Sequence, residues 1–201
     1  MTKIVLATRN PGKLAELRRI LAAAGVSAGV TDLGDVPGMP EVAETGRSFT
    51  ENALLKARAV AAFTGLPAVA DDSGLCVDAL NGMPGVLSAR WSGSHGDDEA
   101  NLRLLLAQLA DVPAGERGAR FVCVAALVLP SGGEHLAEGE VRGQLARSPR
   151  GHNGFGYDPI FVPDGFEITT AQMSADDKDK ISHRGKALRA LAPVIAGELG
   201  G

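Results

Sequence analysis

Two adjacent carboxylates inside an apolar run are the strongest chemical signal in this sequence. Asp71 and Asp72 follow Ala68-Val69-Ala70, and Ser73-Gly74 comes directly after them. We expect a short strand that ends at the acidic pair, followed by a Ser-Gly turn. Successive side chains of a strand point to opposite faces, so the two carboxylates should lie on opposite sides of it. A carboxylate at a strand end can hold a divalent cation or act as a general base.

Basic side chains elsewhere in the chain supply the counterpart of this acidic pair. Five of them could hold an anion: Lys13, Lys56, Lys178, His183 and Arg184. A carboxylate-held cation combined with basic side chains is typical of phosphoryl transfer. A turn, a helix cap or a surface acidic pair would explain the two aspartates without chemistry, but their position between apolar segments favours a site. Phosphatases with an aspartyl nucleophile space their two aspartates by one residue, so the adjacent pair disfavours that class.

The segment Thr8-Arg9-Asn10-Pro11-Gly12-Lys13 is expected to form a strand end, a tight turn and the start of a helix. Backbone N–H groups at a helix N-terminus favour phosphate, Gly12 lets a ligand approach, and Lys13 adds positive charge. The segment is not a Walker A loop, because Ala7 stands where its first glycine would be and Leu14 where Ser or Thr would hold magnesium. A capped helix with a solvated lysine is the alternative.

Lys56 lies four residues after Asn52 on a predicted helix, so the two side chains share a face. Glu44 lies in the polar turn before that helix and could be a second metal carboxylate. The alternatives are a solvated lysine in the middle of the helix and a surface acid in the loop.

Two further segments could recognise a base. In Gly154-Phe155-Gly156-Tyr157-Asp158-Pro159 the glycines let the backbone approach a ligand, and an aromatic face can stack on a base. Asp158 could accept hydrogen bonds from a base edge or hold a basic side chain. In Ser182-His183-Arg184-Gly185, expected to precede the last helix, His and Arg can donate to a purine oxygen or to phosphate. A packed loop and a charged surface turn are the alternatives.

The elements that must position these residues are a mixture of strands and helices. Strands are expected at 3–8, 30–33, directly before Asp71, 121–129, 138–146 and 160–162. Helices are expected from Asn10 to Gly25, from the capping box of Ser48 and Glu51 to Thr64, after Asp97-Asp98, from Ser174, and over 185–199. This order favours an α/β fold with a mixed sheet, in a single domain over residues 1–201 without a separable linker.

Composition narrows the class of protein. The chain has 201 residues, 45% apolar and 22% charged, with a net charge of −4, one Trp and one Tyr, which disfavours nucleic-acid binding. Cys76 and Cys123 lie in apolar stretches and are predicted to be core residues of a protein in a reducing compartment. The first apolar run, residues 3–7, is too short for a signal peptide or a membrane span. We expect a cytoplasmic protein without membrane partners.

Six segments, taken together, resemble the inosine triphosphate pyrophosphatase family, which hydrolyses non-canonical purine nucleoside triphosphates. They occur in the family's order and span nearly the whole chain: residues 6–13, 48–57, 70–75, 84–91, 154–159 and 181–185. The resemblance implies an elongated central mixed sheet flanked by helices, in two lobes with the active cleft between them, and a homodimer. It also implies magnesium-dependent cleavage of ITP, dITP and XTP to the monophosphate and pyrophosphate, which removes deaminated purines from the nucleotide pool.

The resemblance assigns roles at the matching positions. Asp72 is similar to the general base and magnesium ligand, with Asp71 beside it as a further candidate ligand. Other residues resemble the substrate contacts: Thr8, Arg9, Asn10, Pro11, Gly12 and Lys13 as a triphosphate cradle, Lys56 and Ser73 as further contacts, Phe155, Gly156, Tyr157 and Asp158 around the base, and Lys178, His183 and Arg184 as the base-recognition and closing group. Some members carry two acids where this chain has Ala43-Glu44, so Glu44 is the candidate metal ligand there.

The same residues predict a mechanism and a preference. Asp72 would activate a water for in-line attack on the α-phosphorus, while magnesium and the lysines stabilise the leaving pyrophosphate. Donors such as His183 and Arg184 would favour the 6-oxo group of hypoxanthine and xanthine over the amine of adenine. Two alternatives stay open: a nucleotide-binding module without chemistry, and a related pool-cleaning enzyme that prefers another base.

Overall fold

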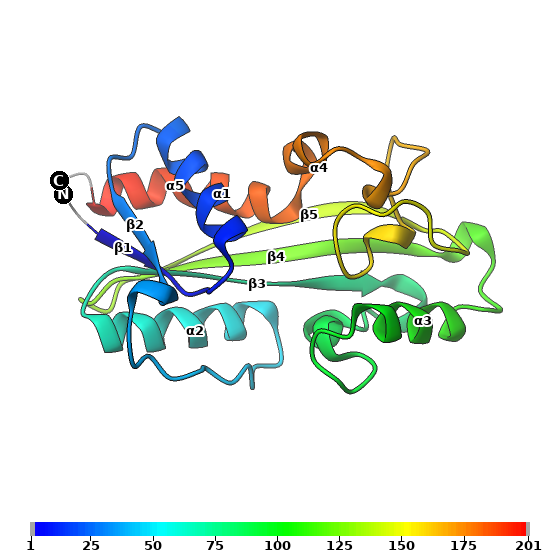
Figure 1. Ribbon diagram of the computed structural model, residues 1–201, viewed down its shortest axis with the longest axis horizontal. Helices are drawn as coiled ribbons and strands as arrows, with labels where there is room; N and C mark the ends of the chain where they lie inside the picture. Colours follow the sequence, from blue (N-terminus) through cyan, green and yellow to red (C-terminus); the bar gives the residue numbers. More distant parts are fainter. Residues whose placement is uncertain (1–2, 200–201) are drawn as a thin grey trace. The chain divides into compact units, whose positions relative to one another are not determined.

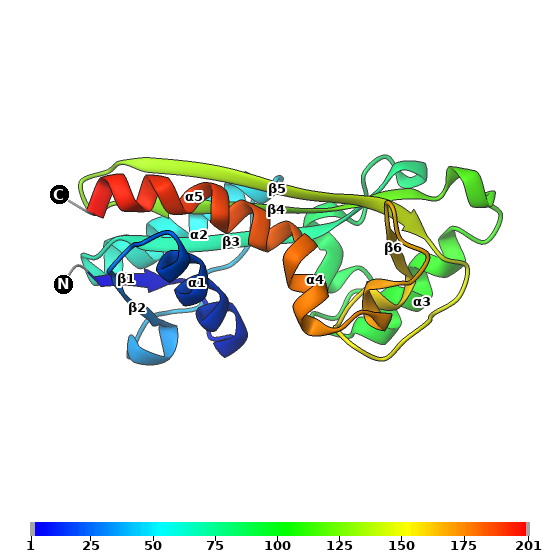
Figure 2. The ribbon, with the colours of Figure 1, turned by 90° about the horizontal axis from the view of Figure 1, so that it is seen from above.

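A mixed sheet forms the centre of the computed structural model, which describes residues 3–199. Its order is β2-β1-β3-β4-β5-β6 (Figure 1). The strands are β1 (Lys3–Leu6), β2 (Gly29–Asp32), β3 (Ala68–Val77), β4 (Gly118–Val128), β5 (Glu134–Leu145) and β6 (Phe161–Pro163). Strand β1 pairs in parallel with both β2 and β3, whereas β6 pairs antiparallel with the end of β5 (Figure 2). The predicted mixed α/β sheet is confirmed.

Local sequence signals mark the ends of several of the five helices. They are α1 (Pro11–Ala23), α2 (Phe49–Thr64), α3 (Asp98–Gln108), α4 (Ala175–Ile181) and α5 (His183–Leu199). Asn10 caps α1 by accepting from two backbone N–H groups, and Ser48 caps α2 by accepting from the N–H of Glu51. Helix α2 ends at Gly65, whose φ of 66° lies in the left-handed region that favours glycine.

Contacts between residues divide the described chain into two compact units. The first holds residues 3–72, 123–139 and 184–199, and the second holds Ser73–Val122 and Glu140–His183. The prediction of one inseparable domain, and that of a cleft between two lobes, stay predictions.

In the first unit, helices cover both faces of the sheet. Helices α1 and α5 lie on one face and α2 on the other (Figure 1). The strand residues alternate accordingly: Ile4 and Leu6 pack into the core with α1 and α5, while Val5 packs into the core with α2. The same alternation continues along β3, where Val69 belongs to the α1–α5 side and Ala70 to the α2 side. The next two residues of this strand are Asp71 and Asp72.

In the second unit, α3 packs against the C-terminal ends of β3 and β5 and the N-terminal end of β4. Leu102 and Leu105 of α3, and Leu109 directly after it, share one core with Leu75 and Val77 of β3. This packing explains why one prediction is wrong: β3 does not end at Asp71-Asp72, and Ser73-Gly74 is not a turn. The strand continues to Val77 because the residues beyond the acidic pair bury apolar side chains against α3.

Three other boundaries also differ from expectation. Strand β4 begins at Gly118 and β5 at Glu134, both earlier than predicted, because each strand extends beyond the apolar or alternating run from which it was predicted. Helix α5 begins at His183, so His183 and Arg184 form its first turn rather than a preceding loop.

Two compositional predictions can be compared with the structure. Cys76 and Cys123 are both buried, which confirms them as core residues. Among residues 3–199, no helix has both the length and the apolar character needed to cross a membrane.

Candidate active site

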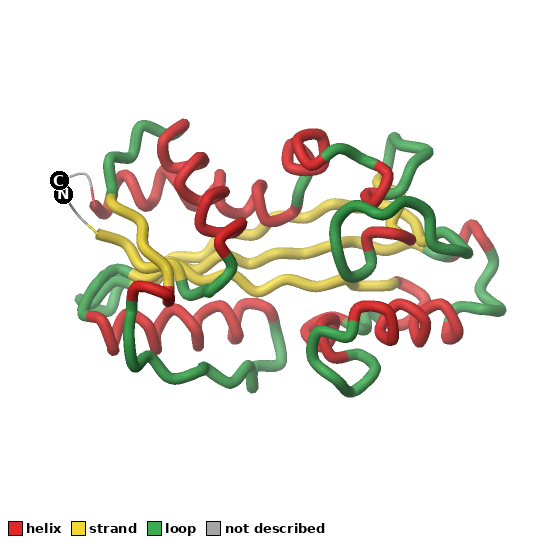
Figure 3. Tube along the Cα trace, in the orientation of Figure 1, coloured by secondary structure: helices red, strands yellow, loops and turns green. Residues whose placement is uncertain are grey.

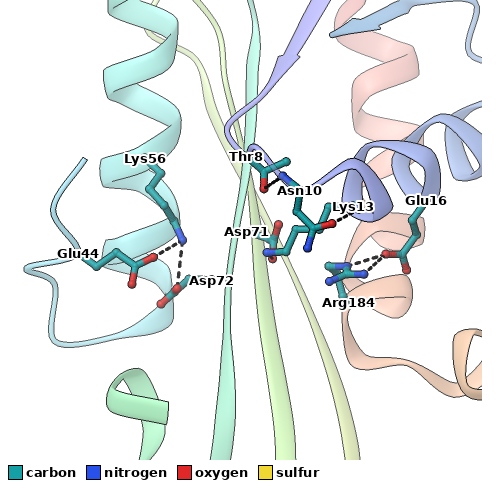
Figure 4. Close-up of polar contacts among 9 residues, drawn as sticks. All are labelled: Thr8, Asn10, Lys13, Glu16, Glu44, Lys56, Asp71, Asp72 and Arg184. Carbon is teal, nitrogen blue, oxygen red and sulfur yellow. Dashed lines mark hydrogen bonds and ion pairs between the residues drawn. The ribbon is translucent and has the colours of Figure 1, made fainter. Parts of the chain in front are cut away.

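Strand β3 presents its two carboxylates to opposite faces of the sheet, as predicted. Asp71 contacts Lys13, whereas Asp72 contacts Asn52 and Lys56 (Figure 4). Both aspartates are buried, with 6% and 7% of their surface exposed. Buried carboxylates are costly unless they are paired, and here each has a cation within 3.1 Å.

The Asp72 side is built by α2 and by the loop that precedes it. The Lys56 ammonium donates to Asp72 Oδ1 at 3.1 Å and to Glu44 Oε1 at 2.7 Å, so one cation bridges two carboxylates. Asn52, one turn earlier, donates to Asp72 Oδ2 at 3.1 Å and accepts from the N–H of Gly46 at 2.8 Å. Asn52 therefore ties the long loop before α2, drawn green in Figure 3, to the carboxylate.

Asn52 belongs to this candidate site, although the sequence did not single it out as a site residue. The spacing to Lys56 placed both side chains on one helix face, and the structure confirms that shared face. That spacing was the available signal, because a fully buried Asn on the same face as a lysine needs polar partners of its own.

The Asp71 side is a second charged network. Lys13 Nζ lies 2.6 Å from Asp71 Oδ2, and the guanidinium of Arg184 donates to Glu16 Oε2 through Nε at 2.6 Å and Nη2 at 2.5 Å. Figure 4 shows these residues on the α1 side of β3. Glu16 is buried, and its Oε1 has no hydrogen-bond partner among the described residues. Sequence reasoning missed Glu16, which lies one turn after Lys13 on α1.

The protein shifts the pKa values of the two aspartates in opposite directions. Burial raises the pKa of Asp72, the negative charge of Glu44 raises it further, and Lys56 and Asn52 offset only part of the rise. Burial also disfavours the charged form of Asp71, but the charges of Lys13 and Arg184 bring its pKa below the ordinary value. Neighbouring carboxyl groups with pKa values driven apart commonly divide the acid–base roles. Asp72 is thus suited to accept a proton, and Asp71 to remain an anion that holds its cations.

The turn before α1 is closed by its own side chains. Thr8 Oγ1 accepts from the N–H of Asn10 at 3.1 Å, and Asn10 Oδ1 accepts from the N–H groups of Gly12 at 2.9 Å and Lys13 at 3.4 Å. Pro11 has no N–H, and the Arg9 guanidinium donates to the carbonyl of Met39. The expected cradle of backbone N–H groups is therefore occupied by the Asn10 cap. The Asn10 amide and the Lys13 ammonium are the donors that this turn can offer to a phosphate.

In the second unit, the loop predicted to meet a base is anchored by Asp158. This buried carboxylate accepts from the N–H of Phe155 at 2.9 Å, from Thr170 Oγ1 at 2.8 Å, and from the Lys178 ammonium. A side chain on Gly154, whose φ is 77°, would overlap the Asp158 carboxylate. Asp158 thus holds the backbone of its own loop and also the basic side chain of Lys178, the second of which was one of the two roles predicted for it.

The two aromatic residues of this loop have different environments. Phe155 is 70% exposed, and Lys178 Nζ lies 5.1 Å from the centre of its ring. Tyr157 is buried in the core with α3, and its hydroxyl donates to the carbonyl of Ser88 at 2.9 Å. The expectation that Tyr157 offers a stacking face is therefore corrected: the open aromatic face here is that of Phe155.

The three basic residues predicted to recognise the base each contact a different residue of the protein. His183 stacks on Phe121 with ring centres 5.0 Å apart, Lys178 pairs with Asp158, and Arg184 pairs with Glu16. Ser73 follows Asp72 in β3, and its buried Oγ is without a hydrogen-bond partner in the described part of the chain.

The two carboxylates beside Lys56, Asp72 and Glu44, are of the type that could hold a divalent cation. Within residues 3–199, no three His, Cys, Asp or Glu side chains form a group that could hold a metal alone. Asp72 and Glu44 nevertheless converge on one ammonium, and magnesium is usually held by one or two carboxylates together with substrate phosphates and water. Asp71 lies on the other face with Lys13, so the structure does not bring it to this pair.

Comparison with known proteins adds independent information. The model of the Ham1 family matches residues 4–194. A dITP/XTP pyrophosphatase of Streptomyces avermitilis is 59% identical over 200 residues, covering 100% of both chains. A crystal structure of a nucleoside-triphosphatase, or dITP/XTP pyrophosphatase, from Mycobacterium abscessus is 59% identical, with a TM-score of 0.83 over 96% of this chain and 100% of that one. A HAM1 protein from Coxiella burnetii is 41% identical, with a TM-score of 0.90 over 98% of this chain and 100% of that one.

Proposed function

Because this chain belongs to the Ham1 family, we propose that it hydrolyses deaminated purine nucleoside triphosphates, namely dITP, ITP and XTP, to the monophosphate and pyrophosphate. The observation that carries the proposal is the environment of Asp72: a buried carboxylate with a raised pKa, beside a lysine and a second carboxylate. A binding module without chemistry would gain little from carboxylates that face a polyphosphate anion. The arrangement therefore favours chemistry over binding alone.

In this mechanism, Asp72 accepts the proton of a water that attacks the α-phosphorus in line. Asn52 holds one oxygen of Asp72 and thereby orients the carboxylate. Lys56 neutralises charge on the phosphates as they approach, and Lys13 does the same from the other face of β3. Asp72 and Glu44 would hold the magnesium ion, which supplies positive charge to the phosphate oxygens when it is bound.

Base recognition is assigned to the second unit and to the first turn of α5. Phe155 offers its exposed ring for stacking on a purine, with Lys178 beside it. His183 and Arg184 supply N–H donors, which favour a 6-oxo group and leave the amine of adenine facing donors. Ser73 Oγ, buried without a partner among residues 3–199, is proposed as a further substrate contact.

Assembly, location and partners belong to the same proposal. The family resemblance supports a magnesium-dependent homodimer, and the composition supports a cytoplasmic protein without nucleic-acid or membrane partners. The net charge of −4 disfavours a nucleic-acid partner.

Pyrophosphate release from a panel of nucleotides tests the function. We expect release from ITP, XTP and dITP that requires magnesium and stops with chelator, with kcat/KM for ATP and GTP lower by about a hundredfold or more. Release from a modified pyrimidine triphosphate instead would identify a pool-cleaning enzyme of another specificity. Nucleotide binding without release from any of them would identify a binding module.

Glu44→Gln tests whether the second carboxylate holds magnesium. We expect the magnesium concentration for half-maximal activity to rise by about tenfold, because a neutral amide is a weaker ligand for a hard cation. Glu41→Gln is the matched control, since it makes the same change on an exposed residue of the same loop. If Glu44 serves only as a counter-ion of Lys56, the magnesium requirement of Glu44→Gln will equal that of the control.

A further inference from the structure

The loop that carries Phe155 is held by a residue far away in the sequence. Asp98, the first residue of α3, accepts through Oδ2 from the N–H of Gly156 at 2.8 Å, across 58 positions of chain. Asp98 is not the cap of its own helix, because Asp97 holds the N-cap position and accepts from the N–H of Ala100 at 3.0 Å. The Asp98 contact therefore serves the loop rather than the closing of α3.

The contact lies at the peptide unit directly after Phe155. The carbonyl of this unit accepts from the N–H of Asp158 at 3.2 Å, and its N–H donates to Asp98. The peptide unit before the ring is held by Asp158, which accepts from the N–H of Phe155 at 2.9 Å. With these bonds, the backbone on both sides of Phe155 is fixed in orientation.

Backbone anchoring matters here because the ring itself is exposed. Phe155 has 70% of its surface open, so core packing does not hold its direction, and the glycines on either side have positive φ angles of 77° and 60°. Glycine backbones lose more conformational freedom on ordering than other residues, so an ordered Gly-Phe-Gly segment needs external hydrogen bonds. Asp98 supplies such a bond to the backbone beside Phe155, from outside the loop, whereas the bond from Tyr157 to Ser88 is made by a side chain.

We propose that Asp98 is a positioning residue that presents the Phe155 ring for stacking on the purine base. This inference rests on the proposed function, because it gives the loop a base to meet. A ring fixed before binding costs less conformational entropy when the nucleotide arrives, which appears as tighter binding. The pKa of Tyr157, the residue after Gly156, also reflects how close Asp98 lies to the loop. Burial raises this pKa most, and the negative charge of Asp98 raises it further.

The competing explanation is that Asp98 only stabilises α3, since a negative charge near a helix N-terminus is favourable. The adjacent Asp97 provides a matched control for that effect. Asp97→Ala removes a carboxylate and a cap from the same helix end without touching the loop. It should lower the melting temperature and leave the kinetic constants for dITP unchanged.

The test combines steady-state kinetics with a double-mutant cycle. We expect Asp98→Ala to raise KM for dITP by about three- to tenfold with kcat changed by less than about twofold, as loss of one charge-assisted hydrogen bond implies. Asp98→Asn keeps an acceptor oxygen and should recover most of the loss. In the background of Phe155→Ala, Asp98→Ala should change KM by less than about twofold, because its effect passes through the ring.

The possible outcomes separate this inference from the proposed function. An unchanged KM for Asp98→Ala in an active protein overturns the inference and leaves the function standing. An equal rise in KM with and without the Phe155 ring also overturns it, because Asp98 would then act by another route. Absence of dITP hydrolysis by the unmodified protein overturns the proposed function, and this inference with it.

Discussion

Asp72→Asn is expected to lower kcat for dITP by about a thousandfold while the protein stays folded. The amide cannot accept the proton of the attacking water, and it is a poorer ligand for magnesium than the carboxylate. The size of Asn matches that of Asp, so the hydrogen bond from Asn52 loses its charge but not its acceptor oxygen. Lys56 keeps a counter-ion, because Glu44 lies 2.7 Å from its ammonium.

The same variant should be more stable than the unmodified protein, with a higher free energy of unfolding at neutral pH. The folded-state pKa of Asp72 is raised above its ordinary value, so the fold favours the protonated form. Such a group contributes stability below its unfolded pKa of about 3.9, and this contribution is lost as pH rises through the folded pKa. At neutral pH the ionised Asp72 is therefore a cost, and a neutral Asn removes it.

Two measurements check this result: single-turnover hydrolysis of dITP and urea unfolding, both near neutral pH. The unmodified protein should also lose activity as pH falls through the raised pKa of Asp72, since its protonated form accepts no proton. An Asp72→Asn variant with near-normal turnover would remove Asp72 from the role of general base. A marked loss of stability would show that its charge supports the fold.

Asp71→Asn is expected to have the opposite signature: a free energy of unfolding lower by about 2 to 4 kcal/mol, with turnover well above that of Asp72→Asn. Asp71 is the buried partner of Lys13 and also lies in the field of Arg184. Removing its charge leaves the Lys13 ammonium without its anionic partner and takes a nearby negative charge from Arg184, which keeps Glu16. An Asn cannot replace that charge, although it fits the same space.

The pH dependence of this effect follows from the direction of the shift. Burial opposes ionisation of Asp71, but Lys13 and Arg184 bring its folded-state pKa below the ordinary value. Its stabilising contribution is thus present above the unfolded pKa and is lost as pH falls through the lower folded value. Urea unfolding should show a constant gap between the unmodified protein and Asp71→Asn near neutral pH, narrowing only below about pH 4.

The two variants form a matched pair, because the same substitution is made at adjacent positions of one strand. Their expected results differ only because the strand directs the side chains to opposite faces. If Asp71→Asn abolished turnover and Asp72→Asn lowered stability, the assignment of roles to the two faces would be reversed. Equal loss of both properties in both variants would show that the pair acts as one unit.

Much of the fold could be predicted from short-range patterns. The caps at Asn10 and Ser48 depend on side chains that reach backbone groups two or three residues away. The glycine at the end of α2 and the alternation of β3 are equally local, and both are confirmed. The spacing of Asn52 and Lys56 correctly placed both side chains on one helix face.

Other features depend on contacts that no local pattern contains. Strand β3 continues past Asp71 and Asp72 because the core with α3 buries its later residues, which lie far from α3 in the sequence. Tyr157 and Phe155 are similar in type and lie two residues apart, yet packing buries one and exposes the other. Aromatic residues between glycines have no local preference for either environment, so only the assembled core decides.

The charged partners show the same division most clearly. The residue types of Asp71, Asp72, Lys13 and Lys56 indicated phosphate chemistry, because a carboxylate-held cation combined with basic side chains is typical of phosphoryl transfer. The resemblance of six segments to a known family made the prediction specific. Which polar groups pair with one another was not predictable from the sequence. Arg184 contacts Glu16 across 168 positions of chain, and Asp98 contacts Gly156 across 58. A charge is attracted equally by every opposite charge at the same distance, so only the tertiary structure, which sets those distances, selects its partner.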